Sequence, residues 1–338
     1  MSDKPRRQHP EPDLEIGDED DEELQEVLRS VIQKATQTTK EDAAALNFVM
    51  LAHPEGGGLQ GDLIFQARQL VQTSLPHRRP PNDEVYVRRN GNASLVVQSG
   101  TDRQGNKIGI PYGAVCRLLF AFLTREAVRK RNRVISLGDT FGAFCRSLGM
   151  DANNGETAKR VTDQLRRMLS CSITFISTTQ LADGQGYEER LNLPVATYAK
   201  LWFRYQRGTH ENASLFGPSV VVLNVDFFDA IVQNPIPLDL DVLLLLKKSP
   251  LAIDIYSWGK YRTFKAKERA HISWYQLAGQ FGAEYKTVSD FKKNFVVALK
   301  KVQAACPELK IKKVKGGLEI TPSRERRRVA IPSGVPRG

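Results

Sequence analysis

The sequence predicts an α+β protein in which one order of elements occurs twice: a long helix, a short strand, two further helices, and then strands. Three observations support this fold class. Apolar residues recur at helical spacing between positions 138 and 176, the same pattern returns between positions 250 and 321, and glycine-containing turns separate alternating apolar residues. A chain of 338 residues with 41% hydrophobic residues fits about two globular domains.

The N-terminal residues are expected to lie outside these domains. Residues 1–40 form an acidic arm that we expect to be disordered, because ten carboxylates lie between positions 11 and 26 and few apolar residues accompany them. A helical pattern also runs over 24–34. Residues 41–84 are expected to be a short helical linker or accessory segment, since a second helical pattern runs over 43–52.

The first domain is expected to span residues 85–235 and to begin with a hairpin. Asn90-Gly91 lies between alternating apolar residues, which is a strong signal for a tight hairpin turn, and a second turn is expected at 103–107. A long apolar helix over 110–128 and a strand at 134–137 follow. The next helix carries Phe144 and Leu148 on one face and ends at Gly149, which suits a left-handed C-cap.

The second helix of this pair, over 156–169, has a basic face. Ala158, Val161, Leu165 and Met168 form its apolar stripe, and the opposite arc is predicted to carry Lys159, Arg160, Gln164 and Arg167. Arginine bonds guanine and glutamine bonds adenine in a bidentate manner, so this face can grip phosphate and read base edges in a major groove. A solvated amphipathic helix is the alternative. Strands over 172–203 and 220–225 complete the domain, and the loop at 182–186 is a wing or an insertion.

The second domain is expected to span residues 236–322 and repeats this order. A buried helix over 250–262, a strand at 271–274, and a helix ending near Gly282 precede a helix that starts at Thr287. A hairpin that turns at Gly316-Gly317 follows, and residues 323–338 form a basic flexible tail. The residues expected to face outward from the last helix and the hairpin are Lys286, Ser289, Lys293, Lys300, Lys312, Lys313 and Lys315.

Helix, strand, helix, turn, helix and strands is the order of a winged helix, so the sequence predicts two tandem winged-helix domains. A helix and a two-stranded ribbon that carry one sign of charge can span a DNA groove and its flanking backbone. The chain holds 49 basic and 38 acidic residues, which gives a net charge of +11 and favours polyanionic partners. Double-stranded DNA is therefore the predicted partner. The acidic arm then has two interpretations: it competes with DNA for the basic surface, or, as we favour, it is a solubilising tail.

The sequence gives little support for an enzyme, a cofactor or a metal site. The five histidines are scattered, which disfavours a metal-dependent DNA-nicking enzyme. Asp239 and Asp241 form a pair that a Mg²⁺-dependent primase-like enzyme would use, but capping of the following helix is the favoured interpretation. The four cysteines are expected to be core thiols. No secretory signal is visible and the apolar run at 242–246 is too short to cross a bilayer, so we expect a cytoplasmic protein without a membrane partner.

Several segments, in their order, resemble plasmid replication initiators of the RepA type. They include Ile110-Pro-Tyr-Gly, Arg117-Leu-Leu, the run from Asp163 to Leu169, and the run from Ser249 to Tyr256, and the resemblance covers roughly residues 85–310. Cys116 and Asp241 depart from the family's tendencies, which are proline and a basic residue at these positions.

The resemblance implies two winged-helix domains that bind repeated sequences (iterons) at a plasmid origin in a bacterial host. It also implies that the protein promotes melting of the origin and recruits the host initiator, helicase and primase. Relatives commonly repress their own promoter as dimers and initiate as monomers, so a homodimer is a further hypothesis for this chain. A transcriptional repressor or a partition-type regulator uses the same DNA-binding units, and that alternative stays open.

Overall fold

The computed structural model describes residues 63–67, 74–180, 185–201, 219–233, 235–282 and 285–323. The expected acidic arm, the helical patterns at 24–34 and 43–52, and nearly all of the basic tail lie outside the described residues. The expectation of a helical segment over 41–84 is wrong for one stretch, because Leu63–Ala67 forms strand β1. Among the described residues, no helix is long and apolar enough to cross a membrane.

The first module runs from strand β2 (Val85–Asn90) to helix α7 (Val225–Gln233) and contains a large antiparallel sheet. This sheet has the order β2-β3-β5-β6, with β3 at Ala93–Gln98, β5 at Ser172–Gln180 and β6 at Gly186–Pro194. The predicted hairpin at Asn90-Gly91 is confirmed, since β2 pairs with β3 and Gly91 has a φ of 58°.

This module also contains a second, smaller sheet. Its order is β4-β8-β7, with β4 at Val134–Ser136, β8 at Val220–Leu223 and β7 at Ala196–Lys200. The helices are α4 (Gly113–Lys130), α5 (Phe141–Ser147), α6 (Gly155–Ser170) and α7. The side chain of Asn224 accepts a hydrogen bond from the Asp226 N–H at 2.9 Å, so Asn224 caps the start of α7.

The turn between α5 and α6 follows the sequence prediction. Thr140 accepts a hydrogen bond from the Ala143 N–H at the start of α5, and Asn154 accepts one from the Thr157 N–H at the start of α6. Gly149 has a φ of 64°, which confirms the predicted left-handed residue after α5. A Cβ atom at Gly149 would lie 2.8 Å from Leu244 Cδ2, so the Leu244 side chain packs closely against this glycine.

The second module contains α9 (Pro250–Lys265), β10 (Ala270–Ser273), α10 (Trp274–Phe281), α11 (Val288–Ala305), β11 (Ile311–Val314) and β12 (Gly317–Ile320). Its sheet has the order β10-β12-β11. At the centre the Phe295 ring packs at a tilted angle against the rings of Phe281 and Phe291, with centroids 5.6 and 5.3 Å away. Such pairs stabilise a core beyond the area that they bury, so α10 and α11 are held tightly together.

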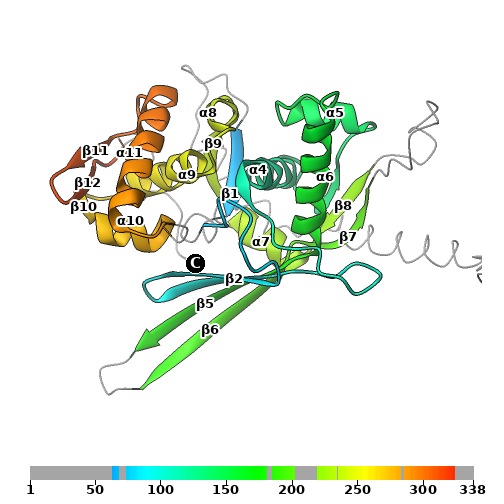
Figure 1. Ribbon diagram of the computed structural model, residues 1–338, viewed down its shortest axis with the longest axis horizontal. Coiled ribbons are helices and arrows are strands. Elements are labelled where there is room, and N and C mark those ends of the chain that lie inside the picture. The colour runs from blue at the N-terminus through cyan, green and yellow to red at the C-terminus, as the bar shows by residue number, and fades with distance from the viewer. Residues whose placement is uncertain are drawn as a thin grey trace, which may run out of the picture.

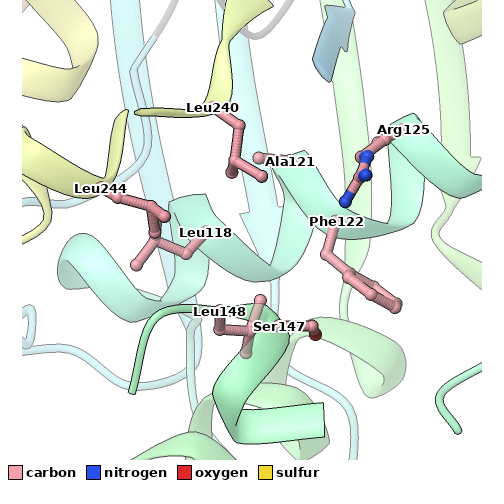
Figure 2. A pocket seen from close by; sticks show the side chains of 8 residues that line it. All are labelled: Leu118, Ala121, Phe122, Arg125, Ser147, Leu148, Leu240 and Leu244. Atoms are coloured by element: carbon pink, nitrogen blue, oxygen red, sulfur yellow. The ribbon is translucent and has the colours of Figure 1, made fainter. Parts of the chain in front are cut away.

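Strand β1, strand β9 (Pro235–Asp239) and helix α8 (Leu240–Leu246) join the two modules. β1 pairs with β9 in antiparallel register. Leu240 and Leu244 of α8 face Leu118 of α4 and Leu148 of α5 (Figure 2). The buried apolar residues of both modules form one continuous cluster. Asp239 accepts hydrogen bonds from the N–H groups of Asp241 and Val242, so it caps α8 as the favoured interpretation of the aspartate pair requires.

A buried ion pair connects the first helix of each module. Arg117 on α4 donates to both carboxylate oxygens of Asp254 on α9, at 2.6 and 2.7 Å, and its other N–H groups donate to backbone carbonyls that include Leu75 at 2.8 Å. His77 Nε2 lies 2.8 Å from the same carboxylate. Burial alone would raise the pKa of Asp254, but the charge of Arg117 and the hydrogen bonds outweigh burial and hold that pKa below its ordinary value.

Arg88 makes a second polar contact between the modules. Its side chain is buried, and its Nε donates to the carbonyl of Gln280 at the end of α10 at 2.9 Å. A cation at a helix C-terminus stabilises the carbonyls that have no partner within the helix. Strand β2 of the first module therefore caps a helix of the second.

The cysteines behave as core thiols. Cys116, Cys145, Cys171 and Cys306 are all buried and free, which confirms the prediction. Burial raises the pKa of the Cys116 thiol to about 12. Because the thiolate is the reactive form, these side chains are inert packing residues.

Replacing Asp254 by asparagine should lower the free energy of unfolding by about 3 to 5 kcal/mol, because Arg117 is left buried without its counter-charge. Urea unfolding followed by tryptophan fluorescence measures this change. The folded-state pKa of Asp254 lies below its unfolded value, so its contribution to stability is present above about pH 4 and is lost as the pH falls further. The wild-type protein should therefore lose more stability than Asp254→Asn when the pH falls from about 6 to about 3.

The matched control is Asp139→Asn, since Asp139 is an exposed aspartate just before α5. This variant should change the free energy of unfolding by less than about 0.5 kcal/mol. Equal losses in the two variants would show that the ion pair does not hold the modules together.

Candidate nucleic-acid interface

Helix α6 presents a basic surface at its N-terminal half. Lys159 and Arg160 are exposed, as the sequence predicted, and Arg166 is exposed one turn and a half further along. Val161, Leu165 and Met168 are buried against the core of the first module. The exposed side of α6 therefore carries three cations, with Asp163 half-buried among them.

The prediction that Gln164 and Arg167 face outward is wrong. Gln164 is 1% exposed and Arg167 is 6% exposed. Gln164 Oε1 accepts a hydrogen bond from the Tyr112 N–H at 2.7 Å, and Arg167 Nε donates to Asp163 Oδ2 at 2.8 Å. The Arg167 guanidinium also lies over the Tyr112 ring, 5.5 Å from its centroid. Both side chains thus hold the segment before α4 rather than a ligand.

The physical reason for this correction lies in the chain that precedes α4. On an isolated helix, Gln164 and Arg167 belong to the polar arc, but residues 109–112 pass over that part of the arc and cover it. Gly109, with a φ of 102°, permits the close passage, since a Cβ atom there would lie 2.0 Å from Arg167 Nη1. Helical spacing alone cannot show this cover. Arg166, which is the exposed arginine in this turn of α6, was also not among the residues selected from the sequence.

Helix α11 presents a more regular basic face. Phe291, Phe295, Ala298, Leu299 and Val302 are buried, and the opposite side carries the predicted residues Ser289, Lys293 and Lys300, all exposed. Val297 lies between the two lysines and is 57% exposed. The helix starts at Thr287, whose side chain accepts from the Asp290 N–H at 3.1 Å, which confirms the predicted cap. Lys286 precedes this cap and is exposed.

The hairpin β11–β12 adds cations beside α11. Lys312 and Lys313 on β11 and Lys315 in the turn are exposed, as predicted. The turn lies at Lys315-Gly316, where Gly316 has a φ of 84°, and Ile311 pairs with Ile320 on the buried side. In the order β10-β12-β11, β11 is at the edge of the sheet.

The two basic helices lie on opposite sides of the joined modules. Figure 1 shows α6 and α11 flanking the central helices α4 and α9. Within the described part of the chain, no group of three histidine, cysteine, aspartate or glutamate side chains is arranged to hold a metal ion.

Exposed cations on two helices and on a two-stranded ribbon are typical of a nucleic-acid-binding protein. Residues 110–276 match the family model described as "Plasmid encoded RepA protein". Over these residues the chain is similar to a family of plasmid replication initiators. Arg117 and Asp254, which form the buried ion pair, both lie inside the matched region.

Two solved structures resemble the chain at low sequence identity. A crystal structure of a selenomethionine derivative of domains 2 and 3 of RctB covers 76% of this chain and 99% of its own, with 11% identity and a TM-score of 0.47. A second crystal structure of RctB domains 2-3 covers 76% of this chain and 98% of its own, with 12% identity and a TM-score of 0.46. A search of curated proteins gave no match.

Arg167→Ala should lower the free energy of unfolding by about 1 to 3 kcal/mol, because it removes charge-assisted hydrogen bonds from a buried position. Arg166→Ala is the matched control, since this neighbouring arginine is exposed, and it should stay within about 0.5 kcal/mol of the wild type. Urea unfolding midpoints measure both values. If Arg167→Ala unfolds with the wild-type midpoint, Arg167 has no structural role.

Proposed function

We propose that the protein is a sequence-specific double-stranded DNA-binding replication initiator. In this proposal it binds the repeats (iterons) of a plasmid origin, promotes melting of the origin, and recruits the host initiator, helicase and primase in the bacterial cytoplasm. The observation that carries the proposal is the family match over residues 110–276. The exposed basic faces of α6 and α11 support it, since duplex binding needs cations at the groove and along the backbone.

Both modules are proposed to be winged helices. The second module has the order α9, β10, α10, α11, β11 and β12, with sheet order β10-β12-β11. The first module gives the same arrangement when β4, β8 and β7 take the places of β10, β12 and β11, because its small sheet has the order β4-β8-β7. On this correspondence the β5–β6 hairpin is an insertion between α6 and β7, and the predicted loop at 182–186 belongs to the insertion.

Helices α6 and α11 are proposed to enter successive major grooves. On α11, Lys293 and Lys300 contact base edges or close phosphates, and the exposed Val297 between them fits against a thymine methyl group. Ser289 and Lys286 flank these contacts. On α6, Lys159 and Arg160 keep this role, and Arg166 replaces the buried pair Gln164 and Arg167. Two such helices on one chain would protect two stretches of DNA whose centres lie about 10 bp apart.

The lysines of β11 and its turn are proposed to contact the DNA backbone as a wing. Lysines on an edge strand also prevent pairing with other chains, which is the alternative explanation for Lys312 and Lys313. The position of Lys315 favours the first explanation, because it lies in the turn, where it protects no strand edge. A repressor or partition-type regulator, acting as a homodimer, would use the same surfaces.

Lys293→Ala and Arg160→Ala should each weaken binding to an origin repeat by about 1 to 3 kcal/mol and weaken binding to a random duplex less. Lys312→Ala should weaken binding to both duplexes alike and should lower the slope of log affinity against log salt by about one. Gel-shift titrations on both duplexes at several salt concentrations separate the two effects. Unchanged affinity in the Lys293 and Arg160 variants would remove both proposed reading helices.

Initiation itself is tested with a plasmid that carries the candidate origin and has no other means of replication. Transformants should appear when the gene of this protein is supplied in trans and should be absent without it. A repressor would bind the same repeats but would support no autonomous replicon. Failure of replication at every level of supply, together with normal repeat binding, would favour the regulator.

A further inference from the structure

A basic cleft lies at the joint between the two modules. Its walls come from residues 77–79, from the start of α4 at residues 112–115, from the turn between α5 and α6, from α6 itself, and from residues 247–250 between α8 and α9. These segments are far apart in the sequence, so the cleft exists only because the modules are docked.

The lining of the cleft is strongly cationic. Arg78, Arg79, Arg160, Lys247 and Lys248 line it, against one carboxylate, Asp151. Asp151 is turned towards the chain, because its Oδ1 accepts a hydrogen bond from the Asn153 N–H at 2.9 Å. Five cations around one concave surface create a positive local potential, so the charge pattern points to a polyanionic ligand.

Some of these cations also contact the protein. Arg79 pairs with Asp83, and Lys247 Nζ donates to the carbonyl of Gly149 at 2.5 Å. Arg78, Arg79, Arg160 and Lys248 are all exposed. The exposed side chains can reach an extended ligand, whereas Lys247 is half-buried and stabilises the wall of the cleft.

The chemistry of the cleft fits phosphate groups better than it fits a nucleotide base. The aromatic rings in the lining are those of His77 and Tyr112; His77 is held by Asp254, and the Arg167 guanidinium lies over one face of the Tyr112 ring. A base would need a free stacking surface or an apolar slot, but the cations form a track that phosphates alone can follow.

We propose that this cleft grips the sugar–phosphate backbone of duplex DNA next to the groove that α6 enters. The inference rests on the proposed function, and Arg160 connects the two surfaces because it lies both on the exposed side of α6 and in the cleft. Lys248 comes from the segment that leads into the second module, so this backbone contact requires the docked arrangement. The cleft supplies affinity without sequence preference, since phosphates are the same at every base pair.

The test compares the double variant Arg78→Ala/Lys248→Ala with the single variant Arg89→Ala and with the wild-type protein. Arg78 and Lys248 are exposed in the cleft, and Arg89 is an exposed arginine on β2, outside the cleft. Urea midpoints first establish that all three proteins fold. Affinities for an origin repeat and for a random duplex are then measured by gel shift over a range of salt concentrations.

The double variant should bind both duplexes on the order of tenfold more weakly near physiological salt, and its log–log salt slope should fall by about two. Its preference for the origin repeat over the random duplex should be unchanged, and Arg89→Ala should behave like the wild type. Ethylation of backbone phosphates should interfere with wild-type binding beside the groove of α6 and should no longer do so at those positions in the double variant.

Three outcomes would overturn the inference. If the double variant keeps the wild-type salt slope while Lys293→Ala loses specific binding, the cleft does not contact DNA but the proposed function stands. If the double variant binds duplexes normally but loses binding of a free nucleoside triphosphate, the cleft is a small-molecule site. If the wild-type protein binds no duplex, the proposed function fails and the inference fails with it.

Discussion

The ion pair between Arg117 and Asp254 determines how the rest of the molecule is arranged. It joins α4 and α9, the first helix of each module, and both side chains are buried. A buried pair gives little net stability compared with apolar residues of the same size, because both charges lose their hydration. What it does provide is geometry: the two carboxylate oxygens of Asp254 accept from two nitrogens of Arg117, which permits one orientation of the helices.

The remaining contacts of the joint reinforce this orientation. Arg88 caps the last carbonyls of α10 from strand β2, strand β1 pairs with β9, and the leucines of α8 fill the space between α4 and α5. As a result, α6 and α11 are placed relative to each other by the protein interior and not by a flexible linker. A ligand that meets both helices meets a preformed spacing, so little conformational entropy is lost on binding.

Much of the local structure was predictable because it depends on neighbouring residues. Asn90-Gly91, Gly149, Thr287 and Gly316 each lie where a turn or a cap needs that residue type, and the structure has a turn or a cap at each of them. The apolar stripe of α11 was predictable for the same reason, because it follows the helical period. These features need no knowledge of the rest of the chain.

The candidate site was less predictable because burial depends on distant segments. Gln164 and Arg167 have the spacing of exposed residues, but residues 109–112, which lie more than 50 residues earlier in the chain, cover them. The order of the sheets was not predicted for a similar reason, since β5 pairs with β3 and β6 pairs with β5, and neither pairs with β4. The basic cleft has no local signature at all, because its cations come from three separate stretches of chain. Pairings of this kind are decided by tertiary packing, which a single sequence does not display.

The position of the ion pair has a consequence for engineering hybrid initiators. A chimaera that takes residues up to 234 from one relative and the remainder from another inherits Arg117 from one parent and Asp254 from the other. If either parent has a different polar partner at this joint, the hybrid contains an uncompensated interior charge even when each half is intact. Exchange of origin specificity between plasmids by swapping halves therefore requires that the α4 and α9 surfaces be transplanted together.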